Sequence, residues 1–427
     1  STTTAAASTV GSVGGNVDIT AGKQYKQVGS DVVAPAGNID ITAKTVNIQE
    51  ARETNKQSTE QKFEQSGLTL SLSSPVLTAV QTAQAMSKAA SQTSDTRMKT
   101  LAAASTALAA SQAAAAVSAG QGDANGQLKN ADGSMVDANA ADKAGGISIA
   151  ISLGSSKSSS KQTSQTDTAR GSTVNAGGNV NISATGGDSE SNLTVQGSDV
   201  KAGNVATLQA DNQVNLLAAA NTNRQTNSQN SSSASVGIGF SLGGQSNGFT
   251  INASASKAQG NGNGSETTYS NTHVAANQVD IKSGGDTTLK GATVNASTVK
   301  ADVGTNPSGS GGNLKIESLQ DTATYAEKSS SAGFGVSLCI PPFCVGSSSA
   351  TVNAGKTKID SNYASVTEQS GIKAGDGGFT VNVQGNTDLK GGAITSTQAA
   401  IDNNKNSFQT GGTLTTSDIE NKASYEA

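Results

Sequence analysis

Tryptophan is absent from this chain, and aromatic residues make up only 3% of its 427 positions. A globular domain of this length normally buries many large apolar side chains, so the composition argues against one conventional core. Charged residues are also scarce, at 14%, and the formal net charge is -4. With no basic patch to neutralise phosphates, a nucleic-acid partner is not expected.

Motifs for cofactors and for membrane insertion are missing as well. No stretch reaches the roughly 18 consecutive apolar residues of a membrane helix. No phosphate-binding GxxxxGK[ST] loop occurs, so neither a cofactor nor a small-molecule substrate is expected. No signal peptide is visible at Ser1, which predicts an internal segment whose export must be inferred from other evidence.

Short apolar-polar-apolar stretches separated by glycine and asparagine fill much of the chain. In Val180-Asn181-Ile182 the two-residue period of a strand sends Val180 and Ile182 to one face. Equivalent starts recur at 15–20, 37–42, 312–316 and 378–383, and 277–281 is a variant without the glycine. Each strand is too small to be stable alone, so the copies must stack.

This pattern predicts an all-β protein, a β-solenoid with a thin aliphatic column in place of a large core. The first two starts lie roughly 22 residues apart, about one turn of a three-sided solenoid. Disorder is the competing interpretation of so polar a sequence, but the aliphatic positions alternate too regularly between glycines.

Residues 75–143 interrupt the repeats with an Ala-rich segment. Ser74 and Pro75 suit the cap and first position of a helix, which is expected to reach about Ala119 or to break near Ser91–Asp95 into a helical hairpin. A Gly/Asp/Asn linker over 121–143 follows. We therefore expect three segments: rungs over 1–74, a helical insertion and linker over 75–143, and rungs with extra hairpins over 144–427. A structural insert packed along the solenoid flank is favoured over a membrane-active or partner-binding helix.

Several strictly alternating stretches lie outside the rung template. They are 146–153, 235–242 paired with 249–253, and 333–338, and each is joined to a polar run. Such alternation predicts long β-hairpins extruded from the solenoid wall. These hairpins hold most of the phenylalanine and are candidates for contacts beyond the stem, although covering the solenoid flank or capping an edge is the simpler role. The candidate contact residues are Phe240, Leu242, Phe249, Phe334, Ile340 and Phe343.

Few residues suggest a catalytic or metal-binding role. His273 is the one histidine, with no second histidine or nearby cysteine for a metal site and no evident nucleophile partner. Asp18, Asp40 and Asp280 occupy outward positions, where stacked carboxylates could bind Ca²⁺ or act as the acid/base pair of a polysaccharide-cleaving enzyme. The equivalent Asn181 and Asn382 point instead to solvated positions. No catalytic, cofactor or metal residue is therefore predicted.

Cys339 and Cys344 are the only cysteines, and they flank Ile340-Pro341-Pro342-Phe343. The two prolines stiffen a turn that could bring the sulfurs together. A disulfide that staples a hairpin tip is the favoured interpretation and implies an oxidising compartment; a pair of buried free thiols is the alternative.

The ordered series of these motifs resembles the haemagglutinin repeats of large two-partner-secreted exoproteins. The resemblance rests on the GGN-V-x-I starts, the element from Val195 to Asn204, the S-x-S-x-G-x-G strands and the Ala-rich insert. This family includes filamentous haemagglutinins and the CdiA-type effectors of contact-dependent growth inhibition, and the similarity is closest to the downstream repeat region of the latter. The resemblance implies a right-handed parallel β-helix and export through an Omp85-type outer-membrane transporter of the producing cell.

Two non-enzymatic functions follow from the resemblance. In the first, the segment engages the target-cell outer membrane or its surface components and assists delivery of a C-terminal toxin. In the second, it is a passive adhesin stalk or haemagglutinin fibre. Either implies a secreted or cell-surface location on a Gram-negative bacterium, with a periplasmic stage before deployment as a further option.

Overall fold

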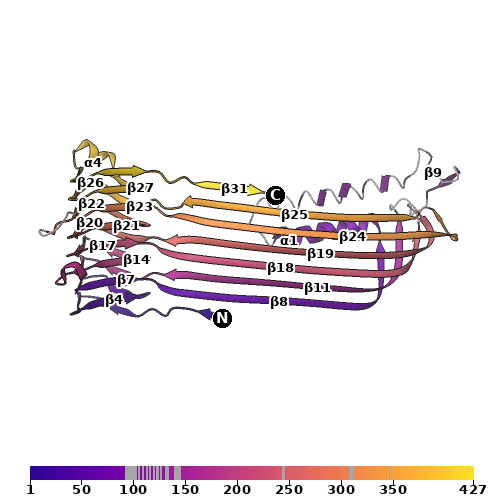
Figure 1. The fold of residues 1–427 in the computed structure, drawn as a ribbon, viewed down its shortest axis with the longest axis horizontal. Helices are drawn as coiled ribbons and strands as arrows, with labels where there is room; N and C mark the ends of the chain where they lie inside the picture. Colours follow the sequence, from indigo (N-terminus) through magenta and orange to yellow (C-terminus); the bar gives the residue numbers. More distant parts are fainter. Residues whose placement is uncertain are drawn as a thin grey trace.

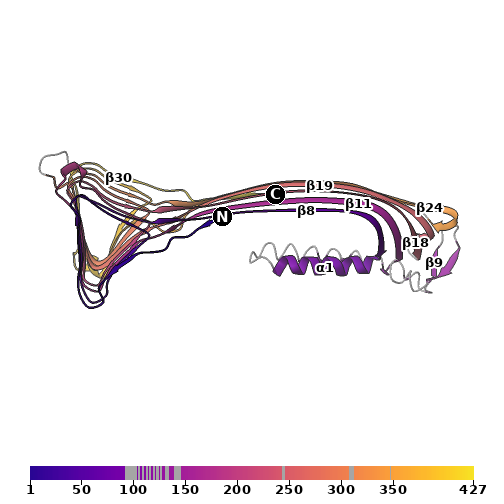
Figure 2. The same cartoon turned by 90° about the horizontal axis from the view of Figure 1, so that it is seen from below.

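A β-helix and one long sheet projecting from it make up the molecule. The computed structural model describes residues 1–91, 146–242, 246–306, 312–346 and 348–427, together with scattered positions between 103 and 138. The β-helix has a triangular cross-section, and the sheet leaves it at one corner and curves away (Figures 1 and 2). The chain is therefore an all-β parallel β-helix with extruded strands and a helical insertion, as the sequence predicts.

Two parallel sheets form the walls of the β-helix. One has 13 strands: β2 (Thr9–Gly11), β3 (Val17–Thr20), β5 (Asp31–Ala34), β6 (Ile39–Ala43), β12 (Thr173–Ala176), β13 (Val180–Ala184), β15 (Asp199–Ala202), β16 (Val205–Ala210), β20 (Thr272–Ser283), β22 (Ala292–Val303), β26 (Gly371–Val383), β28 (Ala393–Thr395) and β29 (Ser407–Thr410). The other has 8 strands: β4 (Gln24–Val28), β7 (Thr45–Gln49), β14 (Leu193–Gln196), β17 (Val214–Leu217), β21 (Thr287–Lys290), β23 (Leu314–Glu317), β27 (Thr387–Lys390) and β30 (Leu414–Ser417).

Aliphatic side chains stacked from rung to rung form the core. Val17 pairs with Ile39, which confirms the 22-residue rung predicted from the first two starts. Ile182 on β13 is flanked by Ile41 on β6 and Leu208 on β16, and all three are fully buried. The column is thin, because each strand contributes only alternate residues, but it is continuous along the stack.

The Gly-Asn starts have a specific structural cause. Asn38 Oδ1 accepts a hydrogen bond of 2.8 Å from the backbone N–H of Asn179 on the next rung, and Asn16 Oδ1 accepts one of 2.9 Å from Asn38. The preceding glycines let the rungs approach closely: a Cβ on Gly177 would lie 2.0 Å from the Pro35 carbonyl oxygen. Asparagine and glycine are thus required at this corner for different reasons.

The extruded hairpins pair with one another into a single antiparallel sheet, which we call the long sheet. Its order is β1-β8-β11-β18-β19-β24-β25-β31. Six of its strands are long: β8 (Ala51–Ser73), β11 (Ile147–Arg170), β18 (Ala219–Leu242), β19 (Ser246–Ser270), β24 (Gln320–Gly346) and β25 (Ser349–Val366). The short β1 (Thr2–Thr3) and β31 (Lys422–Glu426) lie at its two edges. The polar runs joined to the alternating stretches form the inner halves of these strands.

The Ala-rich insertion joins β8 to β11 at the far end of the long sheet. Ser74 Oγ accepts a hydrogen bond of 3.1 Å from the backbone N–H of Leu77, which confirms the predicted cap, and α1 runs from Pro75 to Ser91. Scattered positions between 103 and 118 are also helical, while the predicted break beyond Ser91 lies outside the described residues. The expected packing along the solenoid flank is wrong, because α1 lies beside the outer half of the long sheet, away from the β-helix (Figure 2).

Three smaller elements complete the fold. The predicted linker contains a hairpin of β9 (Gln127–Lys129) and β10 (Met135–Asp137). A 3-10 turn, Asp188–Glu190, lies at one corner of a rung. Helix α4 (Gln398–Asp402) lies against β26, and its Ala400 is fully buried.

Candidate functional site: the apolar end of the long sheet

Directly opposed residues of an antiparallel sheet share a face, so the pairing of the long strands shows which side chains lie together. Near the far end, aliphatic and aromatic residues face one another across strand after strand. One row is Leu70, Ile151, Ile238, Ile251 and Leu338. The rows on either side are Leu72, Ile149, Phe240 and Phe249, and Leu68, Leu153, Val236, Ala253, Val336 and Ala350.

These rows form one surface, which we call the apolar rows. Their side chains remain open to solvent: Leu70 is 73% exposed, Ile151 45% and Ile238 60%. The three rows lie about 6.8 Å apart and cross about five strands spaced about 4.8 Å apart, which gives roughly 500 Å². A contiguous exposed apolar area of this size on a soluble protein usually marks an interaction surface.

The candidate contact residues lie at this end of the sheet. Phe240 and Phe249 face each other, with ring centroids 5.1 Å apart and planes at 64°. Leu242 pairs with Ile147 beside them, and Phe334 pairs with Val352 in the next row inward. Phe334 is 50% exposed. The aliphatic members on β8 and β11 were not among the predicted contact residues, although the strict alternation of 146–153 marks those on β11 in the sequence.

Ile340 and Phe343 lie in a loop of β24 beyond its last pair with β25. Cys339 and Cys344 close this loop with an S–S distance of 2.02 Å. The backbone N–H of Cys339 donates to Ser348 Oγ at 3.0 Å, which fixes the base of the loop. Phe343 is 70% exposed, whereas Cys344 is buried. The loop therefore holds an aromatic side chain outward at the far end of the sheet.

The opposite face of the same strands is built from small and polar residues. Between Leu68 and Leu72, and between Val236 and Phe240, the intervening positions are Thr69, Ser71, Gly237 and Gly239. A Cβ on Gly237 would lie 2.3 Å from Ser152 Oγ, so the glycines keep this face flat. The long sheet is therefore apolar on one side only at its far end.

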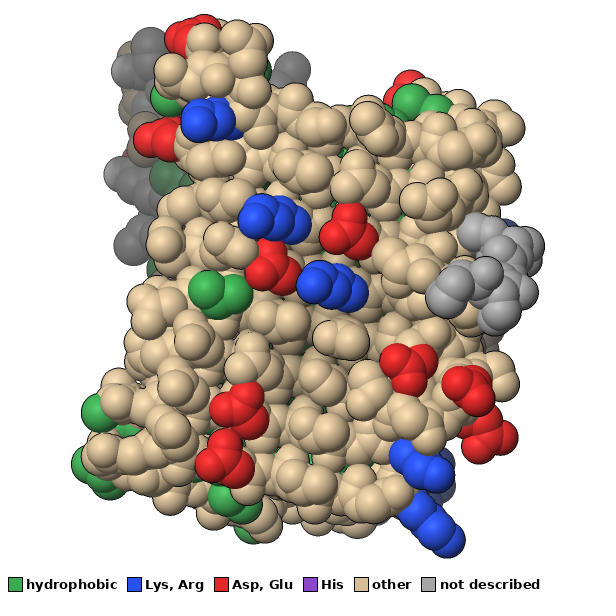
Figure 3. All heavy atoms as spheres, turned by 90° about the vertical axis from the view of Figure 1, so that its left-hand side faces the viewer, with side chains coloured by type: hydrophobic (Ala, Val, Ile, Leu, Met, Phe, Trp, Pro, Cys, Tyr) green, Lys and Arg blue, Asp and Glu red, His purple; other side chains and the backbone are tan. Residues whose placement is uncertain are grey.

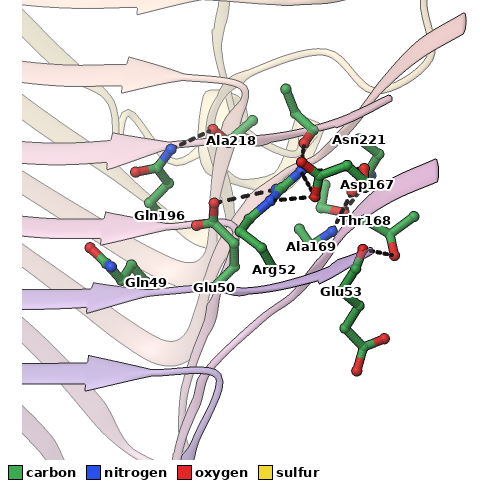
Figure 4. Close-up of polar contacts among 12 residues, drawn as sticks. Gln49, Glu50, Arg52, Glu53, Asp167, Thr168, Ala169, Gln196, Ala218 and Asn221 are labelled. Atoms are coloured by element: carbon green, nitrogen blue, oxygen red, sulfur yellow. Dashed lines mark hydrogen bonds and ion pairs between the residues drawn. The ribbon is translucent and has the colours of Figure 1, made fainter. Parts of the chain in front are cut away.

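The base of the long sheet is fixed by Arg52 (Figure 4). Its guanidinium donates to Asp167 Oδ1 on β11 at 2.9 Å and to the Ala220 carbonyl oxygen on β18 at 2.7 Å. Glu50, at the end of the β-helix wall, lies 3.5 Å away. One side chain thus joins three strands at the point where they leave the β-helix.

The other candidate residues do not assemble a reactive centre. Asp18 and Asp40 stack on adjacent rungs as anticipated, but Asn181 follows them and donates to Asp40 at 2.6 Å, while Asp280 lies two rungs beyond. Among the described residues, no group of three or more His, Cys, Asp and Glu side chains is placed to hold a metal ion. His273 contacts Asp199 and Glu368 at the base of the long sheet.

The wall of the β-helix turned away from the long sheet differs from the apolar rows. It carries scattered acidic and basic side chains among uncharged polar ones, without a continuous apolar area (Figure 3). No helix among the described residues is long and apolar enough to cross a membrane. The far end of the long sheet is therefore the surface best suited to an apolar partner.

Comparison with known proteins identifies the type of repeat. A family model described as a hemagglutinin repeat matches residues 153–334. "Toxin CdiA" of Escherichia coli is 38% identical over 99% of this chain, which covers 13% of that protein. "Deoxyribonuclease CdiA" of Dickeya dadantii is 34% identical over 98% of the chain, covering 12% of that protein. The "Deoxyribonuclease CdiA" of Yersinia pseudotuberculosis is 38% identical over 98% of the chain, covering 36% of it.

No solved structure matches the chain. The relatives match it along nearly its whole length, and the matched family model covers four of the long strands in part or in full. The chain spans only a small part of the length of most of these relatives, and the nuclease activities in their names belong to those proteins. The chain is a haemagglutinin-repeat region of the filamentous haemagglutinin and CdiA type.

Proposed function

We propose that this repeat region is non-enzymatic, that it engages the outer membrane of a target cell through the apolar rows, and that it thereby assists delivery of a C-terminal toxin in contact-dependent growth inhibition. The observation that carries the proposal is the exposed apolar surface at the end of the long sheet. The relatives named as CdiA toxins support the biological context.

The position of the apolar rows suits contact with a membrane. Strand β8 has 23 residues, and at about 3.4 Å per residue its far end lies roughly 75 Å from the β-helix. The β-helix can therefore stay clear of the bilayer while the end of the sheet enters it. Arg52 fixes the base of the sheet, so that the sheet is held out from the β-helix at a defined corner.

The free energy of removing apolar side chains from water favours burial of the apolar rows in an apolar environment. Fully burying a leucine or isoleucine is worth about 1.5–3 kcal/mol, so a half-exposed side chain contributes about 1 kcal/mol when it leaves water. Each row contains several such residues. The one-sided distribution matches a surface that has hydrocarbon on one side and water on the other.

The same proposal includes secretion. The disulfide between Cys339 and Cys344 fits passage through an oxidising compartment. Export through an Omp85-type transporter, a surface location and a periplasmic stage before deployment follow from the resemblance and the relatives' names. Adhesion to a surface without toxin delivery is the alternative that the experiment must separate.

The experiment uses a pair of directly opposed residues in the central row. Ile151→Thr with Ile238→Thr removes apolar area and keeps strand propensity. The matched control is Ser156→Thr with Ser233→Thr, an opposed pair on the other face. In the full-length protein, we expect the first variant to lose entry of the C-terminal cargo while the control keeps it.

Binding to target cells and entry of cargo must be scored separately. Loss of cargo entry with surface display intact supports the proposal, and loss of binding to vesicles made with outer-membrane lipids must accompany it. If the isoleucine variant still binds such vesicles and delivers cargo, the proposal is wrong. If deletion of the whole repeat region abolishes target-cell binding while the shortened protein reaches the surface, the segment is an adhesin.

A further inference from the structure

The lysines of the six long strands share one face of the long sheet. Lys62 and Lys56 are separated from Leu68 by even numbers of residues, so they lie on the face of the apolar rows. Lys157 lies four residues from Leu153, and it pairs with Glu64 and Ser232 of that same face. The full set is Lys56, Lys62, Lys157, Lys161, Lys257, Lys328, Lys356 and Lys358.

We call these eight residues, with the adjoining Arg224, the lysine face. The opposite side of the same stretch consists mainly of serine, threonine, asparagine, glutamine, glycine and alanine, with Phe63, Tyr325 and Ile359 as larger side chains and Glu266 and Glu327 as charges. A chain with a net charge of -4 therefore concentrates positive charge on one side of one sheet. Random placement of outward side chains would not segregate the lysines in this way.

Carboxylates neutralise only part of the lysine face. Glu64 lies 2.6 Å from Lys157, and Glu60 lies 2.8 Å from Lys62. Asp360 pairs with Lys358. Within the described part of the chain, Lys56, Lys161, Lys257, Lys328 and Lys356 have no carboxylate at ion-pair distance. Five lysines thus remain available to an external anion.

A hollow on the lysine face lies next to the apolar rows. Lys62, Lys157 and Lys257 line it together with Glu64 and short side chains such as Ser232, and its volume is about 360 Å³. Lys157 is four residues along the strand from Leu153, a distance of about 13 Å. A lysine side chain can span much of that distance while its ammonium group stays in water.

We infer that the lysine face binds the phosphates of anionic membrane-lipid headgroups while the apolar rows enter the adjacent hydrocarbon. This inference rests on the proposed function and names the lipid chemistry of the same site. The two surfaces occur in the order that a membrane interface requires, apolar at the far end and basic next to it. An amphipathic element with lysines beside its apolar face binds anionic lipid through burial of its apolar side chains and through electrostatic attraction of its lysines.

The test compares the purified chain on vesicles of phosphatidylglycerol and of phosphatidylcholine. The variant Lys161→Gln with Lys257→Gln and Lys328→Gln removes three cations that have no ion pair. At about fivefold per lysine, we expect roughly a 100-fold loss of affinity for phosphatidylglycerol at low salt. Affinity for phosphatidylcholine should not change, and high salt should abolish the difference.

The matched control makes the same charge change on the β-helix, with Lys26→Gln, Lys282→Gln and Lys300→Gln. Unchanged phosphatidylglycerol affinity in this control, with unaltered circular dichroism in both variants, supports the inference. Equal weakening by both triple variants would show a net-charge effect and overturn it. Binding of inorganic phosphate by the wild-type chain, with no preference for phosphatidylglycerol over phosphatidylcholine vesicles, would identify a free-phosphate site and overturn it too.

The remaining outcomes separate this inference from the proposed function. Suppose that the triple variant of Lys161, Lys257 and Lys328 binds phosphatidylglycerol as the wild type does, while Ile151→Thr with Ile238→Thr does not bind. The inference about the lysine face is then wrong, and the proposed membrane contact through the apolar rows is supported. If the wild type binds neither kind of vesicle, both are wrong.

Discussion

His273 on β20 and Asp199 on β15 lie opposite one another on adjacent rungs, with His273 Nδ1 3.0 Å from Asp199 Oδ1. The other ring nitrogen lies 3.2 Å from Glu368, between β25 and β26. The chain's one histidine therefore links two rungs of the β-helix to the base of the long sheet.

This linkage predicts a pH dependence of stability. The hydrogen bond with Asp199 raises the pKa of His273, and the same bond lowers the pKa of Asp199. The histidine contribution is complete below its unfolded pKa of about 6.5 and is lost as pH rises through the raised folded pKa. The Asp199 contribution is complete above about pH 4 and is lost as pH falls through the lowered folded pKa.

The hydrogen bond between His273 and Asp199 therefore contributes its full stability between about pH 4 and about pH 6.5. We expect the thermal midpoint of the wild type to fall between about pH 6 and pH 9 more than that of His273→Gln. Thermal melts of both proteins across this range measure the difference. Parallel melting curves at every pH would show that the ring contributes no pH dependence.

The aliphatic column predicts a large cost for truncation inside the β-helix. Ile182→Ala removes a fully buried side chain between Ile41 and Leu208, which should cost about 2–5 kcal/mol in the free energy of unfolding. Ser183→Ala, on the outward side of the same strand, is the control. Denaturant titration measures both, and equal values would contradict a packed column.

The glycine corner predicts a site that does not accept a methyl group. A Cβ on Gly203 would lie 2.0 Å from the Gly177 carbonyl oxygen, so Gly203→Ala should destabilise the chain by about 1–3 kcal/mol. A Cβ on Gly22 would meet nothing within 4 Å, and Gly22→Ala should leave the midpoint of unfolding within error. The same denaturant titration decides, and an unaffected Gly203→Ala would mean that the corner can open.

Removing the disulfide between Cys339 and Cys344 should destabilise only the end of the long sheet near this loop. Replacing Cys339 and Cys344 by serine opens a loop with a sequence separation of 5, which should cost roughly 2 kcal/mol locally. Amide hydrogen exchange over residues 338–346 should accelerate about 30-fold at that cost. Exchange in β13 serves as the internal control, since its rung shares no contact with the loop. Acceleration throughout the β-helix would show that the loop supports the whole fold.

Much of the β-helix could be predicted because its signal is local. The sequence Gly178-Asn179-Val180 predicts a corner followed by a strand, and β13 begins at Val180. The same residues recur on neighbouring rungs, so a period read from the sequence gives the stacking. Extruded hairpins could be predicted too, from the alternation at 235–242 and 249–253, which pair in the structure.

The long sheet could not be predicted, because its pairing is non-local. Lys157 and Glu64 are far apart in sequence, and only the register of β11 with β8 places them together. The polar stretch 155–170 has no apolar alternation to mark it as a strand, and its backbone is held by neighbouring polar strands. A signal for the lysine face was nevertheless present, since Lys157 and Leu153 are separated by an even number of residues on one strand.

The long strands lie across the direction in which the rungs stack (Figure 1), and this geometry gives the molecule two mechanical axes. Ladder hydrogen bonds of an antiparallel sheet run perpendicular to its strands. A force that pulls the far end along the strands loads many of these bonds together, in shear. A force along the stack pulls parallel to the hydrogen bonds between rungs and separates the rungs one after another. The same molecule therefore resists tension transmitted through the long sheet and yields stepwise to tension along the β-helix.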